Sequence, residues 1–398
     1  MNFSIFKFPA IIVPSYFLLL FAVGCSSTPD VEIPEEIASL ENLAVIEPDA
    51  EPQNSFEFKP VARFGDNDEV LVGRFGGSAV DNRGRVFIAD SDQNVIHAFD
   101  SYGSYITQVG REGQGPGEFG NISTPRVDDN FLYAYDWSQR QINAFDLESL
   151  QFSHVVRLMR EDWNIEELEG LYPNGYYIRS DGSFLVNYSG FFTRGQDDNE
   201  ERFHPIFRIS GEEEIDPEPV FRQRAPQTLT DQSGDSFAVM YSPFLRMPLL
   251  DVAGDDRILS AWSEEFLIKF FSPDGDYEKA IYSPYQRSQL DRGEMIDRYE
   301  DDPWRRIIRN ADMPEVWPAL RHLNIDDENR IWVSTIIDDQ ELYQWWVINP
   351  DGELQTRFEW PRNRNIQSIR NGHLYVQETD PETDLQQIVK YRIEETGH

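Results

Sequence analysis

The sequence predicts an all-β fold, a six-bladed β-propeller with four-stranded blades. A pair of short strands rich in β-branched and aromatic residues recurs six times, each preceded by a turn rich in Asp, Asn and Gly. One four-stranded unit cannot bury both of its faces, but a closed ring of such units can. The predicted second strands lie at 85–90, 131–136, 183–188, 257–262, 330–335 and 373–378, and the third strands at 94–103, 140–149, 204–213, 266–275, 343–352 and 387–395.

The first 24 residues predict a signal peptide. Lys7 precedes an apolar run that is short and interrupted by Pro9 and Pro14, which suits a signal sequence better than a membrane-spanning helix. Small residues directly before Cys25 resemble the lipobox of bacterial lipoproteins. The resemblance implies cleavage before Cys25 and lipidation of its thiol, so we expect the membrane as one partner. An ordinary signal peptide with an incidental cysteine is the alternative.

Cys25 is the only cysteine of the chain, so no intramolecular disulfide can form, and an exported free thiol would be a liability. Ser26 follows at the position where, in the lipoprotein family, an aspartate tends to retain the protein at the inner membrane. The expected location is therefore the cell envelope, as an outer-membrane lipoprotein facing the periplasm or the cell surface.

Residues 25–54 predict an acidic tether. From Ser26 to Asn54 the chain holds eight acidic residues and four prolines but no Lys or Arg. Like charges repel and proline breaks regular structure, so an extended segment is expected. A short helix around 35–44 is the competing interpretation.

Residues 55–396 form the predicted propeller. The sixth repeat ends near the C-terminus without an obvious fourth strand, whereas 55–64 reads as a spare strand. We therefore expect 55–64 to complete the last blade, which removes two open sheet edges at once.

Residues 79–119 resemble NHL-repeat propellers, particularly the six-bladed propeller lipoproteins common in Bacteroidetes-like bacteria. The resemblance is strong over 70–150, fair over 255–285 and 320–395, and weak over 160–245. It implies export, a lipid anchor and six blades, and most members of that family have no established activity.

The glycine-rich stretch 109–125 could hold a phosphate or only turn the chain. It lacks a G-K-[ST] motif, leads into a strand rather than a helix, and carries Glu112 and Glu118. The sequence favours a corner between the first two blades.

Long connections fall on one predicted face of the propeller. These are 158–174, 189–203, 222–243, 284–319 and 378–385, whereas the turns of the opposite face are short. Long loops in compact domains are usually functional or disordered, so this distribution indicates a working face. Helical spacing predicts a helical insertion over 285–319, between blades 4 and 5, either as a lid over the channel mouth or as an element sealing the blade 4–5 seam.

The working face is expected to bind a protein, a peptide or a glycan. Aromatic side chains there could stack on a sugar or a peptide, and polar ones near the first two blades could add hydrogen bonds. The candidate ligand-face residues are Asp90, Asp92, Asp136, Trp137, Arg140, Phe191, Phe192, Trp262 and Trp317.

The net charge of −36 disfavours nucleic acid as a partner, because such a surface repels phosphate backbones. No cofactor, metal site or catalytic residue is expected: the six histidines are scattered without paired-ligand spacing, and no G-x-S-x-G motif occurs. A Ca²⁺-dependent hydrolase or lactonase, or a lyase, at the channel mouth is the main alternative, because ligands from separate blades leave little linear signal. A structural subunit of an outer-membrane assembly is a third possibility.

Overall fold

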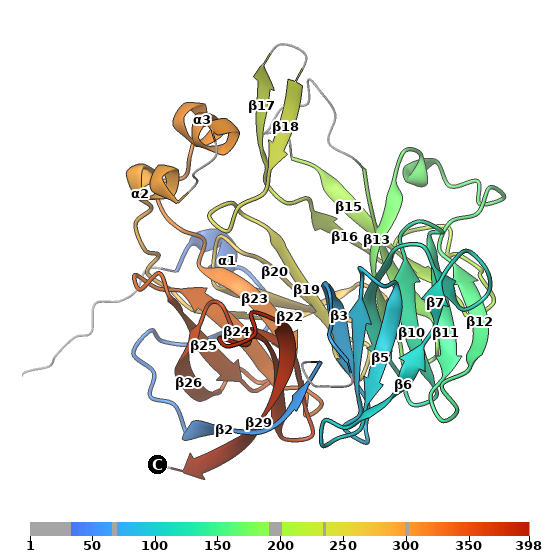
Figure 1. The fold of residues 1–398 in the computed structure, drawn as a ribbon. Coiled ribbons are helices and arrows are strands. Elements are labelled where there is room, and N and C mark those ends of the chain that lie inside the picture. Colours follow the sequence, from blue (N-terminus) through green and yellow to red (C-terminus); the bar gives the residue numbers. More distant parts are fainter. Residues whose placement is uncertain (1–32, 66–69, 191–200, 234–235, 299–301, 398) are drawn as a thin grey trace, which may run out of the picture.

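A computed structural model describes residues 33–65, 70–190, 201–233, 236–298 and 302–397 of the chain. Six antiparallel sheets are arranged around a common axis (Figure 1), and the predicted six-bladed β-propeller is confirmed. In each blade the first strand lies innermost, and the chain runs outward from it, because each strand pairs with the next along the sequence. Inner strands of neighbouring blades contact one another around the axis.

The blades follow the sequence in order. Blade 1 contains β3 (Phe75–Val80), β4 (Val86–Asp90), β5 (Val95–Phe99) and β6 (Tyr105–Val109). Blade 2 contains β9 (Ile122–Val127), β10 (Phe131–Asp136), β11 (Gln141–Asp146) and β12 (Phe152–Arg157). Blade 3 contains β13 (Tyr172–Ile178), β14 (Phe184–Ser189), β15 (Phe203–Ile209) and β16 (Phe221–Arg224). Blade 4 contains β19 (Pro248–Val252), β20 (Ile258–Trp262), β21 (Leu267–Phe271) and β22 (Tyr277–Tyr282). Blade 5 contains β23 (Leu320–Ile325), β24 (Ile331–Ile336), β25 (Leu342–Ile348) and β26 (Leu354–Pro361).

Blade 6 is built from both ends of the chain. β27 (Asn365–Arg370), β28 (His373–Thr379) and β29 (Gln386–Gly397) supply its first three strands, and β2 (Asn54–Phe64) pairs antiparallel with β29 as the fourth. The blue β2 lies beside the red β29 in Figure 1. The expected closure by 55–64 is thus present, and hydrogen bonds rather than a disulfide join the two ends of the ring.

Residues 33–53 do not form the free tether that the sequence predicted. Helix α1 (Glu35–Ala38) is followed by β1 (Leu43–Val45), which pairs parallel with β22 and adds a fifth strand to blade 4. Ile37 and Ile46 are buried against the propeller. These two apolar side chains hold the segment on the propeller, although its average composition is acidic. The remainder of the predicted tether, 25–32, lies outside the described residues.

The core lies between the blades. Six apolar clusters occupy the six blade boundaries, as expected for sheets that are buried on both faces. The cluster between blades 5 and 6 is large and includes Trp332 and Phe56, whereas the described residues place only three buried side chains, Leu185, Ile206 and Ile258, between blades 3 and 4. The boundary between blades 3 and 4 is therefore the thinnest part of the core.

The glycine-rich stretch turns a corner between blades 1 and 2. Its strands β7 (Arg111–Glu112) and β8 (Glu118–Phe119) form a short parallel pair. The carboxylate of Glu118 accepts the Gly115 N–H at 2.8 Å and pairs with Arg111. An acidic side chain of the protein therefore holds the backbone N–H of Gly115, a group of the kind that a bound phosphate would use.

Candidate functional site

Three of the five long connections contain defined elements on the predicted working face, here called the loop-rich face, and residues 191–200 of a fourth lie outside the described residues. After blade 3 the chain forms a hairpin of β17 (Leu229–Ser233) and β18 (Ser236–Met240). After blade 4 it forms α2 (Arg292–Asp297) and α3 (Asp302–Asn310), and a 3₁₀ turn (Glu166–Leu168) follows blade 2. The hairpin and the two helices project from the same side of the propeller (Figure 1).

The hairpin and the helices form one unit, here called the hairpin–helix assembly (229–233, 236–240, 292–297 and 302–310). Met295, Ile307 and Ile308 are buried in the same apolar cluster as Leu229 and Met240, and this cluster continues into blade 5. Arg306 of α3 donates from Nε to Asp231 of β17 at 3.2 Å. The assembly is thus attached to the propeller through the apolar cluster between blades 5 and 6. Both alternatives from the sequence, a lid over the channel mouth and an element sealing the blade 4–5 seam, stay predictions.

A cavity of about 500 Å³ lies between the hairpin, α3 and the rim of blade 4. Its lining carries both charges: Arg246 is 8% exposed and lies 3.5 Å from Glu264, and Asp231 faces the cavity as well. Burial lowers the pKa of Arg246, partly offset by the Glu264 charge. The Thr228 hydroxyl in this lining is buried and has no hydrogen-bond partner within the part of the chain that the structure describes. The size is that of pockets that hold small ligands or single peptide side chains.

Asp90 and Asp136 occupy equivalent positions at the ends of the second strands of blades 1 and 2. Each carboxylate accepts backbone N–H groups from the chain that enters its blade and from the turn that follows it, with Gly73 N–H 2.8 Å from Asp90 and Gly120 N–H 2.8 Å from Asp136. Burial by itself would raise the pKa of both carboxyls, but these hydrogen bonds hold the pKa of each below its ordinary value. The two side chains therefore fix loops, and a contact with ligand stays a prediction.

Three of the other candidates lie on the loop-rich face near blades 1 to 3. Trp137 is 38% exposed and packs on Tyr135 with ring centroids 5.3 Å apart. The Arg140 guanidinium lies 4.4 Å from the Tyr172 ring, and the exposed Asp92 pairs with Arg74, which precedes the first strand of blade 1. Trp137 thus offers an accessible aromatic surface.

The remaining candidates do not gather with them. Trp317 is 3% exposed and packs on Phe244 in the core, so no ligand reaches it in this conformation. Trp262 lies under Arg224, 4.8 Å from its guanidinium, in a groove between blades 3 and 4 that α1 borders. Phe191 and Phe192 lie outside the described residues, as does the candidate lipidation site, Cys25. Sequence reasoning missed Arg246 and Glu264, which carry no motif.

Two further properties of the described residues bear on function. Among the described residues, no helix is long and apolar enough to cross a membrane. In the same part of the chain, no three His, Cys, Asp or Glu side chains are grouped as a metal site requires.

The fold defines the chain as a six-bladed β-propeller, and comparisons with known proteins agree. A family model described as a 6-bladed beta-propeller (DUF5128) matches residues 64–178. A solved structure of a DUF4221 family member from Bacteroides vulgatus is 11% identical with a TM-score of 0.55, over 87% of this chain and 100% of that chain. A Bacteroides fragilis protein described as exported is 12% identical with a TM-score of 0.51, over 89% and 100%.

These likenesses establish the fold alone, because the identities are so low. A streptogramin B lyase structure is similar at a TM-score of only 0.38, with 12% identity over 87% of this chain and 90% of that chain, and bears on no activity here. The search among curated proteins found no match to the sequence.

Proposed function

We propose that the protein is an exported, lipid-anchored binding module that holds a protein, peptide or glycan partner on its loop-rich face. The observation that carries this proposal is the hairpin–helix assembly, which packs on the apolar cluster between blades 5 and 6 and frames a cavity of about 500 Å³. Extra elements of this kind are not needed to close six blades. A recess that combines apolar side chains with a few polar groups is the usual form of a ligand-binding site.

Exposed aromatic side chains on the same face support the proposal. Tyr241, which follows the hairpin, is 65% exposed, and Phe203 and Trp137 are exposed at neighbouring blades. Tyrosine and tryptophan contribute large contact areas at low cost in conformational entropy, so they are common at interfaces. The metal-dependent hydrolase, lactonase or lyase and the structural subunit stay predictions from the sequence.

Site-specific photo-cross-linking in intact cells tests which face binds. A photoreactive amino acid replaces Tyr241 on the loop-rich face or, as the matched control, Tyr102, which is 85% exposed in a turn of the opposite face. We expect a discrete adduct from position 241 and none from position 102. Equal adducts from both positions, or an adduct from position 102 alone, would contradict the proposal.

Labelling with a fatty-acid analogue tests the anchor separately. The full chain should incorporate the label and fractionate with membranes, whereas the Cys25→Ala variant should do neither. A labelled Cys25→Ala variant would show that the thiol is not the lipidation site, and would leave the cross-linking result unaffected.

A further inference from the structure

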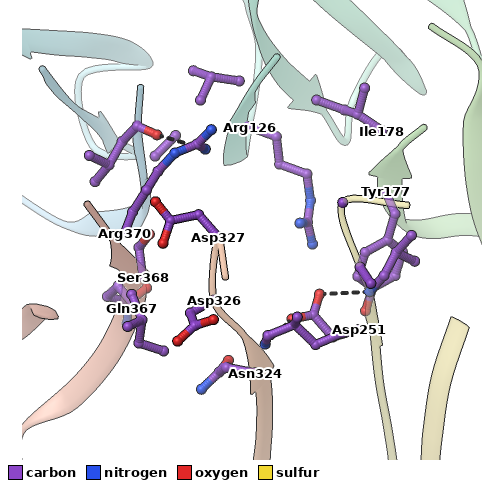
Figure 2. A pocket seen from close by; sticks show the side chains of 18 of the residues that line it. Arg126, Tyr177, Ile178, Asp251, Asn324, Asp326, Asp327, Gln367, Ser368 and Arg370 are labelled. Atoms are coloured by element: carbon purple, nitrogen blue, oxygen red, sulfur yellow. Dashed lines mark hydrogen bonds between the residues drawn. The ribbon is translucent and has the colours of Figure 1, made fainter. Parts of the chain in front are cut away.

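The central channel carries a second cavity, at the opposite end of the axis from the hairpin–helix assembly. Its volume is about 430 Å³, and residues from all six inner strands line it. The lining residues lie in the last part of each inner strand or in the turn that follows, so the cavity opens among the short turns. Figure 2 shows the side chains that surround it.

Three buried polar groups in this lining have no hydrogen-bond partner among the described residues. They are the hydroxyl of Ser78 on β3, the Nε of Arg126 on β9 and the Nε of Arg370 on β27. A buried donor without an acceptor costs free energy, so groups of this kind in one cavity call for a ligand or ordered water that supplies acceptors.

Arg126 is held in place without being neutralised. Its guanidinium carbon lies 4.4 Å from the Tyr177 ring centroid and 5.7 Å from that of Tyr176, while no carboxylate among the described residues forms an ion pair with it. A β-bulge in the pairing of β9 with β10 precedes it, and Thr124 there has a φ of 44°. Bulges redirect side chains next to binding sites, and this one places Arg126 in the channel (Figure 2).

The three carboxylates of the lining accept hydrogen bonds from the protein, and that of Asp327 accepts the Asn371 N–H at 2.8 Å. Asp326 pairs with Arg330 at 2.7 Å and accepts the Trp332 indole N–H at 2.8 Å. Asp251 accepts two backbone N–H groups, from Val252 at 3.0 Å and from Ile325 at 2.8 Å. Burial raises the pKa of Asp251, and the Arg126 charge together with these two hydrogen bonds partly offsets the rise.

We propose that this end of the channel binds a small polar molecule through an oxyanion group, a carboxylate or a phosphate. Arg126 is the bidentate anchor, because its planar fork matches such groups, and Ser78 and Arg370 donate further hydrogen bonds. Asn324, Gln367 and Ser368 line the rest of the cavity and suit hydroxyl groups. The volume fits a molecule of sugar-acid size. This site does not depend on the proposed function of the loop-rich face.

The net charge of −36 acts against an anion at long range. Salt at about 0.15 M reduces that repulsion beyond roughly 8 Å, whereas hydrogen bonds inside the channel are screened much less. The overall charge therefore slows the approach of an anion without cancelling its recognition.

Calorimetric titration of the full chain in detergent tests the site with matched probes. Gluconate, glucose 6-phosphate and glucose share a polyol but differ in carrying a carboxylate, a phosphate or no charge, and acetate and inorganic phosphate serve as the smallest probes. We expect at least one anion to bind and glucose to fail. Binding of gluconate alone identifies a carboxylate ligand, and binding of glucose 6-phosphate alone identifies a phosphate. No signal from any anion at millimolar concentration, or equal binding of glucose, overturns the proposal.

Arg126→Met keeps the aliphatic packing on Tyr177 and removes the donors, so binding should weaken about ten- to a hundredfold. The control is Arg83→Met, an exposed arginine of the same face paired with Glu148, which should change nothing. An equal loss in Arg83→Met would show nonspecific attraction and overturn the proposal. Ser78→Ala adds a second reading, because removal of an orphaned hydroxyl should weaken binding severalfold without lowering the melting temperature. If Arg126→Met fails to fold, unchanged binding by Ser78→Ala and Arg126→Lys would overturn the proposal.

Discussion

The N-terminal strand β2 closes the ring, and Phe64 at its end offers a direct test. Phe64 is 1% exposed and packs on Phe99 of blade 1 and Tyr375 of blade 6, with ring centroids 6.1 and 6.5 Å away. Truncation to alanine removes a buried ring from a boundary that joins the first and last blades. Phe64→Ala should therefore lower the free energy of unfolding by about 3–5 kcal/mol, the usual cost of a phenylalanine cavity.

Urea unfolding followed by circular dichroism measures this loss. Val61→Ala, on the same strand but 48% exposed, is the matched control and should change stability by about 0.5 kcal/mol or less. At the other end of β2, Phe56 packs on Trp332 of blade 5 at 5.8 Å, so Phe56→Ala should resemble Phe64→Ala. If the two phenylalanine variants are no less stable than Val61→Ala, β2 does not hold the ring together and the reasoning fails.

Three further predictions concern the propeller. Burial, together with the Arg321 charge, lowers the pKa of His322 to about 3. The stability that neutral His322 contributes is therefore present above its ordinary pKa of 6.5 and is lost as the pH falls toward 3. His322→Gln should flatten this part of a stability–pH curve measured by urea unfolding. Gly103 has a φ of 97°, and a Cβ there would lie 2.3 Å from the Arg63 carbonyl oxygen. Gly103→Ala should therefore destabilise the protein more than Gly372→Ala, where φ is also positive but a Cβ would have no atom within 4 Å. Equal melting temperatures of the two variants would contradict this. Hydrogen exchange should be faster in β13 and β19, at the thin boundary between blades 3 and 4, than in β27 and β3; uniform protection would count against the packing argument.

The fold could be predicted because its information is local and repeated. Each blade carries its own alternation of strand and turn, and the missing fourth strand of the last blade pointed to 55–64 as its replacement. The docking of 33–53 could not be predicted in the same way. Its acidic composition indicated a tether, while it is held by the three-residue pairing of β1 with β22 and by isolated side chains, Ile37 and Ile46, that form no periodic pattern.

The channel cavity was missed because its parts are far apart in the sequence. Arg126 and Asp251 stand on different blades, and neither belongs to a motif. A weak signal was present in several inner strands. In these strands a polar residue directly precedes the last β-branched residue of the strand, as Arg126, Asp251 and Asn324 do. The candidate residues on the loop-rich face were chosen by residue type, and type alone does not separate the exposed Trp137 from the buried Trp317.

The docked N-terminal segment also changes how a lipid anchor would present the two cavities. A tether from Cys25 to the propeller at Asn54 could span roughly 100 Å, but the described chain already lies on blade 4 from Ile33 onward. The eight steps from Cys25 to Ile33 reach at most about 29 Å. α1 borders a groove between blades 3 and 4 whose lining includes Glu264, a residue that also lines the cavity beside the hairpin–helix assembly. An anchor at Cys25 would therefore hold the seam between blades 3 and 4 near the membrane, whereas the channel cavity opens among the turns of the opposite face.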